Sequence, residues 1–347
     1  MKKSLIALAV VSAFAAGAAN AEVRIYGNLD VGIGSAVADN DNSNGFFTNN
    51  LSTSELGFMS SYELGNTGLT SHLQLGGQIA GNSAGTTGTG PGSYNLDRHK
   101  LVGISGDFGR VDAGTRLNPA FAFWGSTFAM GGNSVAVNGQ FAAGVLNTWV
   151  PNTVTYSSPN LNGLTAQVMY GFNGAGNAVP AAPTVPDNDQ TFTSGAIAYS
   201  TGPLRVGVSY QNHDDPADTI GNTTTVVGGT YDIGALRLSA NYMDADVDAI
   251  DGADNVTMSA GARYAVTSQV AVGGTYMSHD SGASLVNLQA HYAPVPQTTF
   301  YAMVSIIEND EIENANDLQY RTFWGEGTRV AAGDDDSGFT VGVVQRF

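Results

Sequence analysis

The stretch Ser54–Leu75, SELGFMSSYELGNTGLTSHLQL, decides the fold. Apolar and polar residues alternate on both sides of Gly65–Gly68, and a period of two residues predicts β-strands. The Gly-Asn-Thr-Gly segment is typical of a tight turn between two antiparallel strands. The stretch therefore predicts a hairpin with one apolar face, including Leu56 and Phe58, and one polar face, including Glu55 and His72.

The same alternation recurs along the chain in about sixteen segments. They span residues 23–37, 50–63, 68–80, 96–106, 110–116, 149–158, 163–173, 191–201, 203–213, 222–232, 235–246, 254–265, 269–279, 282–293, 298–308 and 336–347. In several of them a tyrosine follows six residues after a leucine, as at Tyr170, Tyr210 and Tyr242. Six residues are about 20 Å of strand, which suits an apolar band about 25 Å tall crossed at a tilt, with tyrosine rings at the water boundary.

The connections between these segments alternate between short turns and long loops. Short turns on one rim and long loops on the other are typical of a transmembrane β-barrel of the bacterial type. A secreted soluble β-sandwich is the alternative fold, but it needs a continuous apolar core, whereas polar faces with Arg, Gln and Glu recur here on strand after strand. The terminal Phe347 fits a last strand that closes a barrel against the first.

The first 21 residues predict a cleaved signal peptide. Lys2 and Lys3 precede a short apolar run, and Ala19-Asn20-Ala21 is an A-x-A cleavage site. The working protein is then residues 22–347. Beyond the leader no apolar run reaches the 18 residues of a membrane helix. The formal charge of −17 argues against a nucleic-acid partner, and the absence of Cys excludes disulfides and thiolate chemistry.

Four segments together resemble the Gram-negative general porins of neisserial and related outer membranes. They are EVRIYGNLDVGI from Glu22, SELGFMSSYELG from Ser54, LVGISGDFG from Leu101 and NTVTYSSPNLNG from Asn152, together with the terminal Phe347. The resemblance implies an all-β, sixteen-stranded antiparallel barrel that assembles as a homotrimer in the outer membrane. It also implies that the loop 117–148 folds into the lumen as a constriction and that the loop 81–95 contacts a neighbouring subunit.

The residues that line such a channel are predicted to differ from the family pattern. Where the resemblance implies basic residues, this chain has Glu55, Met59 and Thr115. The candidate pore-lining residues are Arg24, Asp30, Glu55, Met59, His72, Arg98, Arg116, Phe121 and Trp124. Because lumen charge tunes ion selectivity, loss of the arginine cluster and the presence of Glu55 predict a cation-preferring or weakly selective channel.

Residues 117–186 contain no Asp, Glu, Lys or Arg, and the inward loop offers Phe121, Phe123, Trp124, Phe128 and Met130 instead. Two interpretations stay open. The rings pin the loop to the inner wall, or they line an eyelet that suits neutral or amphipathic solutes.

Acidic residues gather in the outer loops, and Asp244, Asp246 and Asp248 alternate at a strand end. Such carboxylates suit Ca²⁺ or Mg²⁺ and a bridge to lipopolysaccharide; the alternative is a solvated acidic rim. No cofactor and no catalysis are expected, because the five histidines lack metal spacing and no nucleophile motif is present. The sequence thus predicts a barrel embedded in membrane lipid, with a channel through which small solutes and ions pass. The alternative function is a structural or adhesive barrel with a largely closed pore.

Overall fold

The computed structural model describes residues 22–38, 41–79, 94–96, 98–131, 145–172, 191–214, 221–247, 255–280, 282–308 and 335–347. The predicted signal peptide, the predicted subunit-contact loop apart from Tyr94 and Asn95, and most acidic loop residues lie outside this description. The strands are β1 (Glu22–Ala38), β2 (Asp41–Thr48), β3 (Glu55–Glu63), β4 (Thr70–Ile79), β5 (Tyr94–Asn95), β6 (Lys100–Gly106), β7 (Gly109–Leu117), β8 (Trp149–Ser157), β9 (Leu164–Gly171), β10 (Thr191–Thr201), β11 (Leu204–Asp214), β12 (Asn222–Ile233), β13 (Leu236–Val247), β14 (Asn255–Ala265), β15 (Val270–His279), β16 (Ser284–Val295), β17 (Thr298–Glu308) and β18 (Asp336–Arg346).

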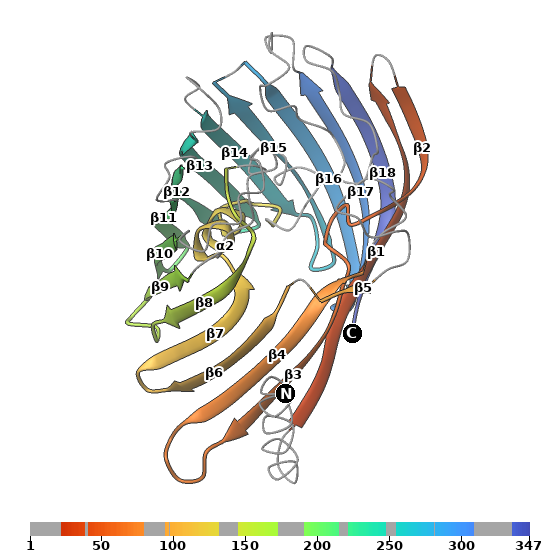
Figure 1. Cartoon of the computed structure of the whole chain (residues 1–347). Helices are drawn as coiled ribbons and strands as arrows, with labels where there is room; N and C mark the ends of the chain where they lie inside the picture. Colours follow the sequence, from red (N-terminus) through yellow and green to blue (C-terminus); the bar gives the residue numbers. More distant parts are fainter. Residues whose placement is uncertain are drawn as a thin grey trace.

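These strands form one antiparallel sheet that closes on itself. β1 pairs with β18 along one edge and with β2 and β3 along the other (Figure 1). β2 and β3 share one position beside β1, and β5 and β6 share one position beside β4, so the described strands fill sixteen positions. The prediction of a closed sixteen-stranded antiparallel barrel is confirmed.

The prediction was wrong where the second strand begins. Residues 41–48 were assigned to a loop, but they form β2 and pair with the upper half of β1. The ladder breaks at residues 49–54, where Asn49 has a φ of 66°. Asp30 stabilises this break, because its Oδ2 accepts hydrogen bonds from the amides of Leu51 and Ser52 at 2.6 and 2.8 Å. Asp30 is fully buried there, so it supports the wall and does not line an open channel.

The outer face of the barrel is apolar and carries two levels of aromatic rings. On each strand the outward residues are the exposed ones, as the alternating pattern of β17 shows. Tyr170, Tyr210 and Tyr242 are 43%, 45% and 39% exposed on this outer face, as the sequence predicted. Tyr199 and Tyr231 form part of a second level near the short turns. An exposed apolar wall between two levels of tyrosine is the surface that a bilayer requires.

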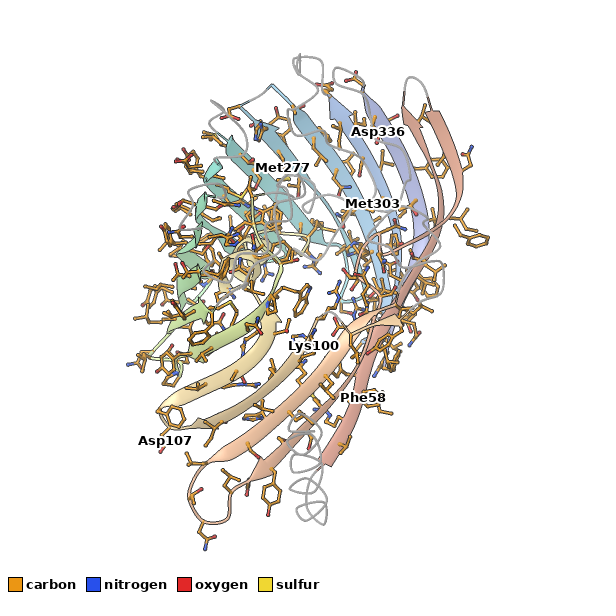
Figure 2. The ribbon with its side chains drawn as sticks, in the orientation of Figure 1. Phe58, Lys100, Asp107, Met277, Met303 and Asp336 are labelled. Atoms are coloured by element: carbon orange, nitrogen blue, oxygen red, sulfur yellow. The ribbon has the colours of Figure 1, made fainter. Side chains whose placement is uncertain are left out.

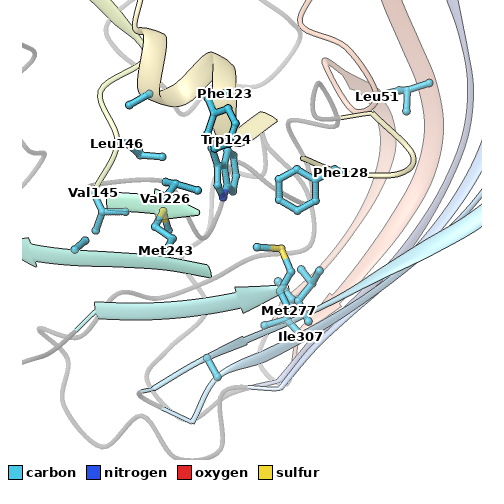
Figure 3. Packing of buried hydrophobic residues seen from close by; sticks show 14 of the residues in the cluster. Leu51, Phe123, Trp124, Phe128, Val145, Leu146, Val226, Met243, Met277 and Ile307 are labelled. Carbon is cyan, nitrogen blue, oxygen red and sulfur yellow. The ribbon is translucent and has the colours of Figure 1, made fainter. Parts of the chain in front are cut away.

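The chain after β7 turns into the barrel and forms the helix α2 (Pro119–Ser126). The sequence offers a local reason that the prediction missed. Asn118 caps the helix by accepting from the amide of Ala120, and Pro119 occupies the first turn, where its missing N–H costs nothing. Phe123, Trp124 and Phe128 pack in a cluster with Val226, Met243 and Met277 of the inner wall (Figure 3).

No helix in the described part of the chain is long and apolar enough to cross a membrane.

Candidate functional site

The hairpin of β3 and β4 has one face on the outside and the other on the lumen. Phe58 lies outward and is 43% exposed, beside Leu75 of the next strand (Figure 2). Glu55 and Met59 lie on the opposite, inward face. Met59 pairs with Gln74 on one side and with Arg24 of β1 on the other, so the cross-strand register brings these three side chains to the same inner surface.

Tyr26 occupies a niche in this inner wall that sequence reasoning missed. Its ring lies over Gly57 and Gly76, where an added Cβ would approach Tyr26 atoms at 2.3 and 2.4 Å. Gln74 donates to the Tyr26 hydroxyl at 2.9 Å. The two glycines therefore make room for the ring, and their position across two paired strands is the signal that could have revealed it.

Glu55 forms an ion pair on this wall. The guanidinium of Arg98 lies 3.6 Å from its carboxylate, and both side chains are mostly buried. Arg98 also donates to Gln78 at 3.3 Å and lies 5.1 Å from the ring centre of Trp149. Trp149, from β8, contacts His99 edge to face at 4.5 Å. The segment between β5 and β6 thus directs a cation and an imidazole into the lumen, where Glu55 pairs with the cation.

A second charged group lies on β7, next along the wall. Asp112 accepts from the Arg110 Nε at 2.7 Å and also pairs with Arg116. Gly103 on β6 leaves the space that the Asp112 carboxylate fills, since a Cβ there would lie 2.1 Å from it. His72 lies on β4, which pairs with β6, and its Nε2 is hydrogen-bonded to the Ser105 Oγ of β6 at 2.7 Å.

We expected an inner wall without a basic cluster, and this arrangement corrects that expectation. Glu55, Met59 and Thr115 lie at positions where the resemblance implied basic residues. Arg98, from the segment before β6, and Arg110 and Arg116, from β7, nevertheless supply guanidinium groups to the inner wall. Every arginine among the described residues lies on an inward face: Arg24, Arg98, Arg110, Arg116, Arg205, Arg237, Arg263 and Arg346. The inward carboxylates with described side chains are Asp30, Glu55, Glu63, Asp112, Asp232 and Asp336. The described lumen is therefore slightly basic inside a strongly acidic chain.

The inward loop is held to the opposite wall by a buried polar network around Asn118. Its Nδ2 donates to the carbonyl of Asn147 and to Gln211 Oε1, both at 2.7 Å. Its Oδ1 accepts from Ala120 N at 3.0 Å and from Ser194 Oγ at 2.5 Å. One side chain therefore ties both ends of the loop to β10 and β11.

The aromatic residues of the loop face this wall. Trp124 is fully buried between Phe121 and Phe128, with ring centres 5.7 and 4.9 Å away. Phe121 is only partly buried. The structure thus favours the interpretation in which the rings pin the loop, and Trp124 is not exposed to the lumen. Residues 132–144 of the loop lie outside the described residues.

The acidic outer residues are described only in part. Asp244 and Asp246 lie on the same exposed face near the end of β13, two residues apart. Asp248 lies outside the described residues. Among the described residues no group of three metal-ligating side chains gathers. A Ca²⁺ or Mg²⁺ site at this rim stays a prediction.

Comparison with known proteins gives one family. The model of the Gram-negative porin family matches residues 7–312. Among curated relatives, outer membrane porin protein 32 of Delftia acidovorans is 27% identical over 374 residues, covering 100% of both chains.

Solved structures share the same fold. The anion-selective porin from Comamonas acidovorans superposes with a TM-score of 0.71 at 22% identity, covering 94% of this chain and 100% of that one. The trimer form of OmpT from Vibrio cholerae superposes with a TM-score of 0.64 at 17% identity, covering 94% of this chain and 99% of that one.

Proposed function

Because this chain belongs to the Gram-negative porin family, we propose that it forms a water-filled channel for passive diffusion of small hydrophilic solutes and ions. It is located in the bacterial outer membrane, as its relatives, which are outer membrane porins, are. The relatives are channel proteins, and no described group forms a catalytic constellation. The observation that carries the proposal is the closed barrel with charged groups on its inner face and a loop pinned within it.

The charge arrangement supports transport of solutes in water. Arg98, Arg110 and Arg116 line one wall, with Glu55 and Asp112 between them. The pinned loop lies against the opposite part of the barrel, on β10 to β13. Solutes would pass between a wall of alternating charge and a loop that the sequence makes uncharged. Alternating guanidinium and carboxylate groups orient polar molecules without binding them tightly.

The ion preference that we propose is weak and leans toward anions. The cation preference expected from Glu55 loses its basis, because Arg98 neutralises that carboxylate. The described inward arginines also outnumber the inward carboxylates. The anion-selective relative has the same fold, which supports this direction.

We further propose that the working unit is a homotrimer embedded in membrane lipid and lipopolysaccharide. The support is the trimeric form of the Vibrio cholerae relative and the apolar outer wall with its tyrosine levels.

Planar-bilayer recording tests the proposed function. The purified protein should insert with conductance steps that come in threes, and a salt gradient should give a reversal potential slightly on the chloride side. A strong potassium preference would overturn the charge assignment. A bilayer that stays silent after verified insertion would overturn the channel itself and favour the structural or adhesive alternative.

A further inference from the structure

The link between β2 and β3 holds more residues than the ladder along β1 can pair. β2 ends at Thr48, which pairs with Val31 of β1. β3 begins at Glu55, which pairs with Asn28 of β1 (Figure 1). Six residues, 49–54, therefore lie opposite two residues of β1, an excess of four. An uninterrupted antiparallel ladder pairs residues one to one, so the excess must leave the wall. We call residues 49–54 the inner lip.

The inner lip lies on the lumen side of the wall. Leu29 is 44% exposed on the outer face, so the next residue, Asp30, points into the barrel, where it is fully buried. Tyr301 of β17 also points inward and is 2% exposed. Both residues bond to the lip. The Asp30 carboxylate accepts from the Leu51 amide at 2.6 Å, and Asn50 Nδ2 donates to the Tyr301 hydroxyl at 3.3 Å. The lip therefore covers the inner faces of β1 and β17.

The inner lip is held in one position by polar and apolar contacts. Asn28 Nδ2 donates to Ser52 Oγ and to the Thr53 carbonyl, both at 2.9 Å. Leu51 is 8% exposed and belongs to the same buried apolar cluster as Phe128 of the inward loop (Figure 3). The lip and the inward loop thus share one packed cluster inside the barrel.

The inner lip covers a carboxylate that has no cation beside it. Asp30 Oδ1 accepts from the Tyr301 hydroxyl at 2.7 Å, and Oδ2 accepts from two lip amides at 2.6 and 2.8 Å. Among the described residues, no Lys, Arg or His forms an ion pair with Asp30. The lip itself, Asn-Asn-Leu-Ser-Thr-Ser, carries no charge. Amide and hydroxyl dipoles therefore hold the negative charge, and the lip separates it from water in the lumen.

We propose that the inner lip is a second constriction of the channel, in addition to the inward loop, and that it limits cation passage by keeping ions away from Asp30. The attraction between a cation and a carboxylate falls with their separation, so a cover of uncharged residues weakens it. The inference rests on the proposed channel function and adds an element that sets its width and its ion preference.

The first test is a deletion of residues 50–53. It removes the excess of four residues and lets residues 49 and 54 pair with the two free positions of β1. Because four is an even number, every side chain of β2 and β3 keeps its inward or outward direction. The measurements are single-channel current and reversal potential in planar bilayers.

The deletion should raise the conductance, because the passage is wider. It should also lower the chloride-to-potassium permeability ratio several-fold, because potassium then reaches Asp30 directly. An unchanged conductance would overturn the constriction. An unchanged or higher permeability ratio would overturn the shielding of Asp30.

The matched control combines the deletion with Asp30→Asn, which keeps the wider passage and removes the charge. Its conductance should stay raised, and its permeability ratio should return toward the wild-type value. If the ratio stays as low as in the deletion alone, the shift does not come from Asp30 and the shielding is wrong.

The second test locates the lip and does not depend on the deletion. The chain has no cysteine, so Thr53→Cys places a single thiol on a partly exposed lip residue. Reaction with a trimethylammonium methanethiosulfonate adds a bulky cation and should lower the single-channel current and shift the reversal potential toward chloride. The control is Val227→Cys on β12, which is outward and 51% exposed and should show no change.

An unchanged current at position 53, whether or not the thiol reacts, would place the lip outside the passage and overturn the inference. The outcomes also separate this inference from the proposed function. A conducting protein that is insensitive to the deletion and to the thiol reagent overturns only the lip. A protein that stays silent after verified insertion overturns the channel.

Discussion

Removal of the Asn118 side chain should release the inward loop from the barrel wall. In Asn118→Ala, four hydrogen bonds of 2.5 to 3.0 Å are lost, and Gln211 and Ser194 lose a buried partner. Each hydrogen bond contributes about 1 kcal/mol net, and more when its partner stays buried and unsatisfied, so the loss is roughly 3–6 kcal/mol. At about 1.4 kcal/mol for each factor of ten, the ratio of docked to released loop falls roughly a hundred- to ten-thousand-fold.

Single-channel recording measures this release. The released loop should raise the mean conductance and broaden its distribution, while the barrel ladder, which the substitution does not touch, keeps the protein folded. Asn118→Asp keeps the two accepted bonds and loses the two donated ones, so its conductance should lie between wild type and Asn118→Ala. Asn160→Ala, which removes one exposed turn bond of 2.6 Å, is the matched control. Wild-type conductance and noise in Asn118→Ala would refute the reasoning.

Three further substitutions test the walls. Glu55→Gln leaves its paired guanidinium uncompensated, and one unit charge acting through about 7 Å of water changes an ion's energy by about 0.6 kcal/mol, with opposite sign for chloride and potassium. The chloride-to-potassium permeability ratio should therefore rise by roughly sevenfold, and a shift toward potassium would contradict the pairing. Asp30→Asn weakens the acceptors for two amides and the Tyr301 hydroxyl. It should lower barrel stability by about 2–3 kcal/mol, read from the midpoint of urea unfolding, and an unchanged midpoint would count against this role. Gly76→Ala places a Cβ 2.4 Å from the Tyr26 hydroxyl and should cost about 1–3 kcal/mol, whereas Gly45→Ala, with open space around it, should leave the urea midpoint unchanged.

Sequence alone determined the barrel and the direction in which each strand residue points. Side chains of a strand alternate strictly, so Phe58 outward and Glu55 inward follow from the pattern without any knowledge of distant contacts. The number of strands followed as well, because each crossing of the bilayer repeats the same signal. The break between β2 and β3 did not follow, since it depends on Asp30, which binds amides more than twenty residues away.

The charge of the channel was decided only by the tertiary structure. Glu55 and Arg98 are 43 positions apart, and nothing local to either residue shows that they meet. The role of the aromatic rings in the loop was also decided by tertiary structure. The sequence left two interpretations open, and the contacts of Asn118 with Ser194 and Gln211, together with the full burial of Trp124, favour the one in which the rings pin the loop. Local periodicity fixes which face a residue occupies, because strand geometry repeats every two residues. Closure of the barrel fixes which residues share that face, because it joins strands that are far apart in the chain.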